Sequence, residues 1–279
     1  MFAGCLDQNG EGASRLKKNV SDSSRLHIIP LDVTRDESVE KALKSVQSIL
    51  EEKEVKLFGV VNNAGILRVG QFEWGSLDYM VKDVMEVNTM GVARVTKSFL
   101  PLIRESQGRI VNINSTASRY SVPTLVSYCM AKHASMALTE GLRREMKKFR
   151  VKVISVEPFI YGTRLAGKEV ISSLLEDAFK SSSEQVRSSY GSRFLDIMKK
   201  VGVNTGSNMG SKSINDVSAA VVHALTSAEP ELRYNCCVWY LRPLIWAGIH
   251  LCPTEVFEIL TQRSLASCKL DKCYPEKDS

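Results

Sequence analysis

The clearest pattern along the chain is an alternation between short apolar runs and longer segments with helical spacing. Between Asp36 and Glu52, valine and leucine recur on one helical face, and acidic residues occupy the first turn, where they favour the helix dipole. The apolar runs are typical of buried strands. The expected strands are Arg25–Leu31, Val55–Val61, Arg109–Ile113 and Val151–Val156, and the other expected helices are Leu77–Glu105, Val126–Phe149 and Asp216–Thr226.

Strands and helices that alternate in this way form βαβ crossovers, with a parallel sheet between two layers of helices. We therefore expect an α/β fold built as a doubly wound, three-layer α/β/α sheet. In such sheets ligands bind beyond the carboxyl ends of the strands. Functional residues are thus expected where the strands end, at Asp32, Asn62–Gly65, Asn114–Ser115 and Glu157–Pro158.

The pattern weakens between Thr163 and Asp216, where serine and glycine are frequent. This composition predicts loops or short helices, which we interpret as a cover over the site, at about residues 164–213. The last residues, 267–279, are polar and predict a frayed tail. The expected organisation is one domain over residues 1–266 followed by that tail.

Composition narrows the classes of function. The 279 residues are 44% hydrophobic and 24% charged, which is typical of a globular protein with one sizeable core. The net charge of +6 comes from scattered lysines and arginines without a basic stripe, so a nucleic-acid partner is not expected. Seven cysteines without zinc-site spacing indicate a reducing compartment and no metal site.

Targeting and membrane signals are weak. No signal or transit peptide is recognisable at Met1, and no apolar run is long enough to span a membrane. The segment 236–252 is apolar and aromatic but is interrupted by Arg242 and Pro243. It suits either a buried lid or a membrane-surface contact, and the caution that applies to short apolar runs favours the buried interpretation.

The strongest chemical signal is Tyr128-Cys129-Met130-Ala131-Lys132. Residues four apart share one face of a helix. An ammonium beside a phenol favours the phenolate, so we expect Lys132 to lower the pKa of Tyr128 and make it a usable acid/base group. Ser115, at the end of an expected strand, could hydrogen-bond the same substrate oxygen. Asn88, inside an apolar helical face, either satisfies a kink or holds a water.

Each of these residues also has an ordinary structural interpretation. A tyrosine and a lysine four apart on a helix are common, and alone the pair would indicate nothing. Ser115 could be a turn cap, Asn88 a satisfied core amide, and Asn62–Gly65 a turn that ends a strand. Their joint occurrence in this order at strand ends favours a catalytic site.

Taken in order, these motifs resemble the short-chain dehydrogenase/reductase family over roughly residues 1–265. The matching segments are Asn62-Asn63-Ala64-Gly65, Val87-Asn88, Ser115 and Tyr128-x-x-x-Lys132; Leu31-Asp32-Val33 and Glu157-Pro158…Thr163 also resemble family segments. Finer matches, such as Thr96–Arg104 and Leu142–Met146, resemble the branch of the D-3-hydroxybutyrate, retinol and 17β-hydroxysteroid dehydrogenases. The aromatic segment Trp239–Arg242 favours the hydroxybutyrate enzymes by a small margin.

The resemblance implies a Rossmann-like fold and hydride transfer between NAD(H) and a secondary alcohol or ketone, with NADP as an open alternative. Tyr128 would exchange the proton, Ser115 would orient the substrate oxygen, Lys132 would assist Tyr128 and hold the nicotinamide ribose, and Asn88 would hold a relay water. It further implies a homo-oligomer at a mitochondrial or endoplasmic reticulum membrane surface. The implied cofactor-binding residues are Asp32, Val33, Asn62, Ala64, Gly65, Tyr128, Lys132, Pro158 and Thr163.

The chain departs from the family pattern at several positions. Phe159 stands where the family has glycine, and it could crowd the nicotinamide. Asn114, Ser118 and His133 are further differences. The family's first strand and glycine-rich phosphate loop should precede Phe2 and are not found, so we expect an incomplete N-terminus and, as a competing hypothesis, a non-catalytic remnant that only binds a partner or a lipid surface.

Overall fold

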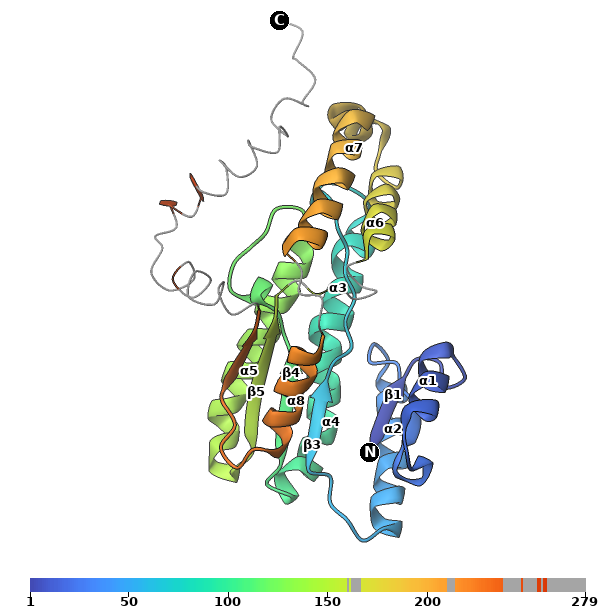
Figure 1. Cartoon of the computed structure of the whole chain (residues 1–279), viewed down its shortest axis with the longest axis vertical. Helices are drawn as coiled ribbons and strands as arrows, with labels where there is room; N and C mark the ends of the chain where they lie inside the picture. Colours follow the sequence, from blue (N-terminus) through green and yellow to red (C-terminus); the bar gives the residue numbers. More distant parts are fainter. Residues whose placement is uncertain are drawn as a thin grey trace, which may run out of the picture.

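The computed structural model describes residues 1–159, 161, 167–209, 214–237, 247, 255–256 and 258–259. Within them, the predicted alternation of strands and helices is confirmed, and the sheets are entirely parallel with helices on both faces. Figure 1 shows the strands side by side below a pair of projecting helices. The fold class predicted from the sequence is therefore confirmed.

The strands form two sheets. The first pairs β1 (Phe2–Cys5) with β2 (His27–Pro30), and the second has the order β3–β4–β5–β6. No strand among the described residues joins the two. The second sheet consists of β3 (Gly59–Asn62), β4 (Arg109–Ile113), β5 (Lys152–Pro158) and β6 (Arg233–Cys236).

Side chains that alternate along β4 and β5 divide the core into two layers. Ile110 and Val153 pack against α4 and α5, whereas Val111 and Ile154 face α8. All four are nearly inaccessible to solvent, as expected of parallel strands covered on both sides. The covering helices are α4 (Val92–Glu105), α5 (Val126–Met146, continued by the short turn η5, Lys147–Phe149) and α8 (Asn215–Thr226).

The N-terminal unit contains β1, β2 and two helices, α1 and α2. Val39 and Val46 on α2 pack with Val95 and Phe99 on α4, so the unit shares a core with the larger sheet. Figure 1 shows this blue unit beside β3 and α4. Its helices are α1 (Glu11–Asn19) and α2 (Asp36–Glu52), with a short turn, η1 (Ser23–Arg25), before β2.

The predicted helix Leu77–Glu105 is present but is not uniform. Two wider, π-type turns interrupt it around the short α3 before α4 begins. Such turns leave backbone spacing irregular and are frequent at functional sites. The segments are η2 (Asp78–Lys82), α3 (Asp83–Met85) and η3 (Glu86–Gly91), and η3 contains the predicted catalytic Asn88.

One prediction about the cover is wrong. The segment expected to form loops or short helices contains two substantial helices, α6 (Lys168–Lys180) and α7 (Glu184–Met209), with a break at Gly191. The sequence concealed them because their helical order depends on tertiary packing. Trp74, fully buried, makes edge-on ring contacts with Phe179, Tyr190 and Phe194 of these helices.

Other expectations fall partly or wholly outside the described residues. The tail 267–279 does so entirely, and of the segment 236–252 only Cys236, Cys237 and Ala247 are described. Cys129, Cys236 and Cys237 are buried, in keeping with the interpretation of cysteines as small hydrophobic residues. None of the described helices is both long and apolar enough to cross a membrane.

Candidate active site

Tyr128 and Lys132 lie one turn apart near the start of α5, as predicted. Lys132 is 5% exposed, and its Nζ donates a hydrogen bond to the carbonyl oxygen of Ile113, at the end of β4, over 2.8 Å. The same Nζ lies 5.7 Å from the centre of the Tyr128 ring. The lysine is thus held between the helix and the carboxyl end of the central strand β4.

Ser115 begins the short turn η4 (Thr116–Ser118), two residues beyond β4. Its hydroxyl accepts a hydrogen bond from the backbone N–H of Ala117 at 3.1 Å and donates to the carbonyl oxygen of Pro158 at 3.3 Å. The Ser115 hydroxyl also acts to lower the pKa of the Tyr128 phenol, which places the two groups in the same site. The predicted proton donor and the predicted orienting hydroxyl therefore meet at the carboxyl ends of β4 and β5.

Asn88 is fully buried and braces the turn after β3. Its amide Nδ2 donates to the carbonyl oxygen of Ile66 at 2.9 Å, and its Oδ1 accepts from the N–H of Ile66 at 2.8 Å. A Cβ added to Gly65 would lie 3.3 Å from Asn88 Oδ1 and 4.0 Å from Lys132 Nζ. Gly65 therefore permits the backbone to approach both predicted catalytic side chains, and Asn88 is placed in the same cluster as Lys132.

The electrostatics differ from one expectation. Lys132 was expected to lower the pKa of Tyr128, but burial raises that pKa to about 12, and the Ser115 hydroxyl only partly opposes the rise. Burial also lowers the pKa of Lys132 to about 8. Both shifts have one cause, because a buried site disfavours whichever form carries a charge.

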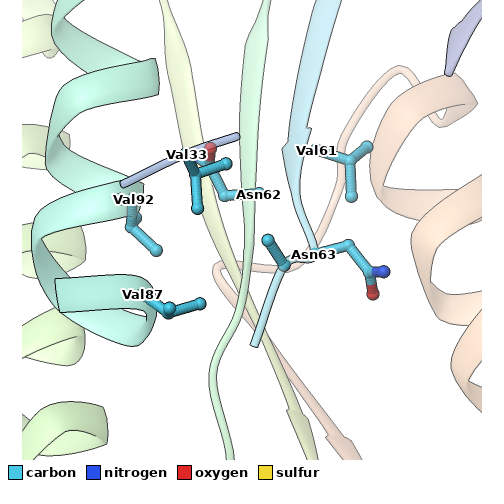
Figure 2. Close-up of a pocket in the computed structure, with 8 residues that line it drawn as sticks. Val33, Val61, Asn62, Asn63, Val87 and Val92 are labelled. Carbon is cyan, nitrogen blue, oxygen red and sulfur yellow. The ribbon is translucent and has the colours of Figure 1, made fainter. Parts of the chain in front are cut away.

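Three of the predicted cofactor residues, Val33, Asn62 and Ala64, line an open pocket beside η3, shown in Figure 2. Val33, from the loop after β2, and Val87, from the helical segment, line it. Gly91 was not predicted as a site residue, although a glycine inside a helical run is a signal of close approach. A Cβ there would lie 2.7 Å from Val33 Cγ2. The pocket is lined by Val33, Val61, Asn62, Asn63, Ala64, Val87, Gly91 and Val92.

Two of the predicted cofactor residues have clear structural partners. Asp32 Oδ1 accepts hydrogen bonds from the N–H of Thr34 at 2.9 Å and from its hydroxyl at 2.6 Å, and these bonds lower the pKa of Asp32. Asn62 donates its amide to Thr96 Oγ1 at 2.9 Å and to Asn112 Oδ1 at 2.8 Å. The carboxylate of Asp32 is therefore a fixed negative charge two residues beyond β2, and Asn62 connects the end of β3 to β4.

The segment after β5 is described only in part. Pro158 ends β5, and Phe159 donates its N–H to the carbonyl oxygen of Cys236 at 2.9 Å. Phe159 is partly buried, and Thr163 lies outside the described residues. The expectation for Thr163 therefore stays a prediction.

Comparison with known proteins identifies the family. A family model described as short chain dehydrogenase matches residues 2–172, more than half of the chain. The chain belongs to the short-chain dehydrogenase family. As a member of this dehydrogenase/reductase family, it is an NAD(P)-dependent oxidoreductase by class.

Curated relatives of this short-chain dehydrogenase have several substrates in their names. It is 41% identical to the mitochondrial D-beta-hydroxybutyrate dehydrogenase of Rattus norvegicus over 87% of the chain and 71% of that enzyme. It is 36% identical to 17-beta-hydroxysteroid dehydrogenase type 6 of Bos taurus, over 95% of the chain and 80% of that enzyme. It is 37% identical to retinol dehydrogenase 7 of Rattus norvegicus, over 84% and 72%.

Solved structures show the same fold. A short-chain dehydrogenase/reductase from Burkholderia phymatum in complex with NAD has a TM-score of 0.66 and 22% identity, covering 93% of this chain and 85% of that one. A short-chain dehydrogenase from Burkholderia cenocepacia in complex with NADP has a TM-score of 0.61 and 20% identity, covering 95% and 85%.

The sequence analysis predicted Asn114 and Glu157 as strand-end residues but missed Asn112, Thr139 and Ser155, which are buried polar residues around this dehydrogenase site. Asn114 Nδ2 donates to Ser155 Oγ at 3.0 Å, and Ser155 Oγ donates to Glu157 at 3.0 Å. Asn112 donates to Thr139 Oγ1 at 2.9 Å. The available signal was the presence of amide, hydroxyl and carboxylate side chains inside otherwise apolar strands, since a buried polar group needs a partner. No cluster of metal-ligating side chains occurs in the part of the chain that the structure describes.

Proposed function

We propose that this chain transfers a hydride between NAD(H) and a secondary alcohol or ketone, with Tyr128 as the acid/base group. The observation that carries the proposal is the convergence of Tyr128, Ser115 and Lys132 at the carboxyl end of β4. In parallel α/β sheets this is the end at which ligands bind. The pocket lined by Val33, Asn62 and Ala64 lies beyond β2 and at the end of β3, which fits a bound nucleotide.

The nicotinamide ring, when bound, supplies or accepts the hydride. Tyr128 exchanges the proton with the substrate oxygen, and a pKa raised to about 12 keeps the phenol protonated at neutral pH, ready to donate to a ketone. Ser115 hydrogen-bonds the same oxygen and orients it. Lys132 holds the nicotinamide ribose with its Nζ, while Asn88 fixes the backbone at Gly65–Ile66, where we also predict the relay water.

For the cofactor, we propose NAD(H) rather than NADP(H). The carboxylate of Asp32 is kept ionised by its hydrogen bonds with Thr34, and Val33 beside it lines the pocket. A fixed negative charge at this end of the sheet disfavours the additional phosphate of NADP, since like charges repel. Related folds carry either cofactor, so the test is direct: kcat/KM measured with both.

For the substrate, the surroundings of Tyr128 favour an apolar alcohol of the retinol or hydroxysteroid type over 3-hydroxybutyrate. Tyr128 packs against a cluster that includes Leu67, Val69, Trp74 and Phe179. A substrate carboxylate would need a partner cation, since a buried unpaired charge is costly.

Three cations described near this cluster already have partners, although Arg68 Nε is buried without one. Arg68 lies 3.3 Å from Asp83 Oδ2 and over the ring of Tyr79, and Lys199 lies 2.5 Å from Glu176. Arg187 donates to the carbonyl oxygens of Lys180 and Ser182. This engagement supports an uncharged substrate.

The experiment is a turnover assay of the purified chain with NAD or NADP, followed by the ultraviolet absorbance of the reduced nicotinamide. Retinol, a 17β-hydroxysteroid and 3-hydroxybutyrate are compared at equal concentration. We expect turnover with NAD and the first two. Turnover of 3-hydroxybutyrate above both would contradict the substrate assignment, and absence of turnover with all three and both cofactors would contradict the proposed function.

Location and assembly stay predictions. The D-beta-hydroxybutyrate dehydrogenase of Rattus norvegicus is named as a mitochondrial enzyme. By the resemblance we propose a mitochondrial or endoplasmic reticulum membrane surface for this chain, and a homo-oligomeric state. Cell fractionation followed by size-exclusion chromatography with light scattering tests both, and a monomer free of membranes would contradict them.

A further inference from the structure

Four charged side chains form a cluster behind Ser115, and the proposed mechanism uses none of them. At its centre is Glu157 on β5, whose side chain is 1% exposed. Arg119 reaches both oxygens of this carboxylate, with Nη2 to Oε1 at 3.1 Å and Nε to Oε2 at 3.3 Å. This two-pronged contact, here called the Arg119–Glu157 fork, joins the residue after η4 to the penultimate residue of β5.

Two further residues complete the cluster from neighbouring elements. Glu140 on α5 lies 3.1 Å from Arg119 and 3.3 Å from Arg233, measured between carboxylate oxygen and guanidinium nitrogen. Arg233, on β6, also lies 3.2 Å from Glu157. Two positive and two negative charges leave the cluster neutral, so each buried charge has a partner.

A buried ion pair is weak evidence for a contribution to stability, because removing charges from water offsets most of their attraction. What a guanidinium fork supplies is orientation. Its planar donors match the two oxygens of a carboxylate in one arrangement, which a lysine cannot reproduce. The role of the fork therefore depends on which atoms it holds in place.

The two segments that the fork joins are those that hydrogen-bond Ser115. Arg119 directly follows η4, whose first turn is capped by the Ser115 hydroxyl. Glu157 directly precedes Pro158, whose carbonyl oxygen accepts a hydrogen bond from Ser115 Oγ at 3.3 Å. Loss of the fork would free η4 to shift along the end of β5, and Ser115 would move with it.

A third connection reaches the residue before the serine. Asn114 donates its amide to Ser155 Oγ at 3.0 Å and accepts from Ser135 Oγ on α5 at 2.8 Å. Ser155 Oγ in turn donates to Glu157 Oε1 at 3.0 Å. The carboxylate of Glu157 is thus linked to both sides of Ser115, through Asn114 before it and Arg119 after it.

We propose that Arg119 and Glu157 are positioning residues that fix the hydroxyl of Ser115 relative to Tyr128. The proposal rests on the proposed function, in which Ser115 orients the substrate oxygen. Neither residue touches the substrate; both act through the serine. A displaced Ser115 would lower kcat while leaving the cofactor contacts of Lys132 in place.

The test replaces Arg119 with lysine, which keeps the charge and removes the fork. We expect Arg119→Lys to lower kcat about 10- to 100-fold, since a displacement of about 1 Å can cost that much, while KM for the cofactor stays near the parent value. Arg233→Lys is the matched control, because Arg233 contacts the same two carboxylates from β6 without joining η4. Its kcat should stay near the parent value, and an equal loss in both variants would overturn the proposal.

Combination with Ser115→Ala shows whether the effect passes through the serine. If it does, Arg119→Lys lowers kcat no further in the Ser115→Ala background, because the positioned group is already gone. Full additivity would overturn the inference. If Ser115→Ala alone leaves turnover unchanged, the proposed function fails instead. In that case the coupling of Arg119 and Ser115 is tested by the urea unfolding midpoints of the parent, the two single variants and the double variant. Additive shifts of the midpoint would show that the two residues are not coupled, and would overturn the inference.

Discussion

The two sheets of the molecule differ in how completely they are built. β4 and β5 are buried almost throughout, with helices on both faces and paired strands on both edges. β1 and β2 form an isolated pair in which partly exposed residues predominate. The proposed acid/base residues all belong to the region around β4 and β5. Asp32 and Val33, which are proposed to contact the nucleotide, follow β2 in the smaller sheet.

This difference separates two requirements of the same reaction. Proton transfer needs side chains held to within fractions of an ångström, which a buried, fully hydrogen-bonded framework provides. Nucleotide binding tolerates a less rigid support and makes contact over a wider surface. We therefore expect the larger sheet to fix the geometry of the acid/base residues. Cofactor affinity should depend instead on how well the smaller sheet, β1–β2, is ordered.

The largest expected effect is at Tyr128. Tyr128→Phe removes the proton donor and should lower turnover by about 10²–10⁴-fold, while cofactor affinity changes little because the phenol is not needed to hold the nucleotide. Steady-state kinetics and cofactor titration measure the two quantities. Tyr234→Phe, which removes a phenol on β6 bound to His223, is the matched control and should keep near-parent turnover. Turnover of Tyr128→Phe close to that of the parent would refute the assignment.

The second prediction concerns the two sheets directly. Backbone amides of β4 and β5 should exchange with solvent only on global unfolding, whereas those of β1 and β2 should exchange through local opening, which requires less free energy. Hydrogen exchange followed by mass spectrometry measures this contrast. Equal protection of both sheets in the chain as it stands would contradict the comparison.

The third prediction concerns the buried ammonium of Lys132. Its pKa is lowered to about 8, so between about pH 8 and its ordinary value of 10.5 the unfolded chain binds the extra proton, and stability should rise with pH in that window. Lys132→Met should remove this rise and increase the free energy of unfolding at pH 7 by about 1–3 kcal/mol. Urea titrations at pH 7 and above pH 10 measure the effect.

The same substitution should abolish most turnover and weaken cofactor binding, because Lys132 is proposed to hold the ribose. In the parent, ketone reduction should decline above about pH 8 as Lys132 loses its proton. A Lys132→Met variant that is less stable than the parent at pH 7 would show that the hydrogen bond to Ile113 outweighs the cost of burial.

The smallest expected effect is at Phe159, where the family pattern has glycine. Its N–H donates a hydrogen bond to the carbonyl oxygen of Cys236, and the residue is partly buried directly after β5. Phe159→Gly should tighten cofactor binding or raise turnover by a few-fold if the ring crowds the nicotinamide. Phe149→Gly serves as the control, because Phe149 lies in η5, beyond the C-terminal end of α5. No change in either quantity would show that the ring points away.

Much of the architecture could be read from local patterns. The helix Asp36–Glu52 was predicted with the bounds observed, because its apolar face repeats strictly and its first turn is acidic. β4 was predicted equally well, since a run of β-branched residues between polar turns has few alternatives. The helices α6 and α7 were missed, because serine and glycine weaken their intrinsic propensity and their order depends on Trp74, about a hundred residues earlier in the sequence.

By itself, the sequence determined the alternation of strands and helices between β2 and β5, the family resemblance, and the residues expected to carry out proton transfer, because periodicity and spacing are properties of neighbouring residues. Only the tertiary structure decided that Asn88 hydrogen-bonds the backbone of Ile66, and that burial raises the pKa of Tyr128. It also decided that Arg119 makes a two-pronged contact with the carboxylate of Glu157. The physical reason is that burial and hydrogen-bond partners depend on which distant segments meet, and no local spacing encodes that.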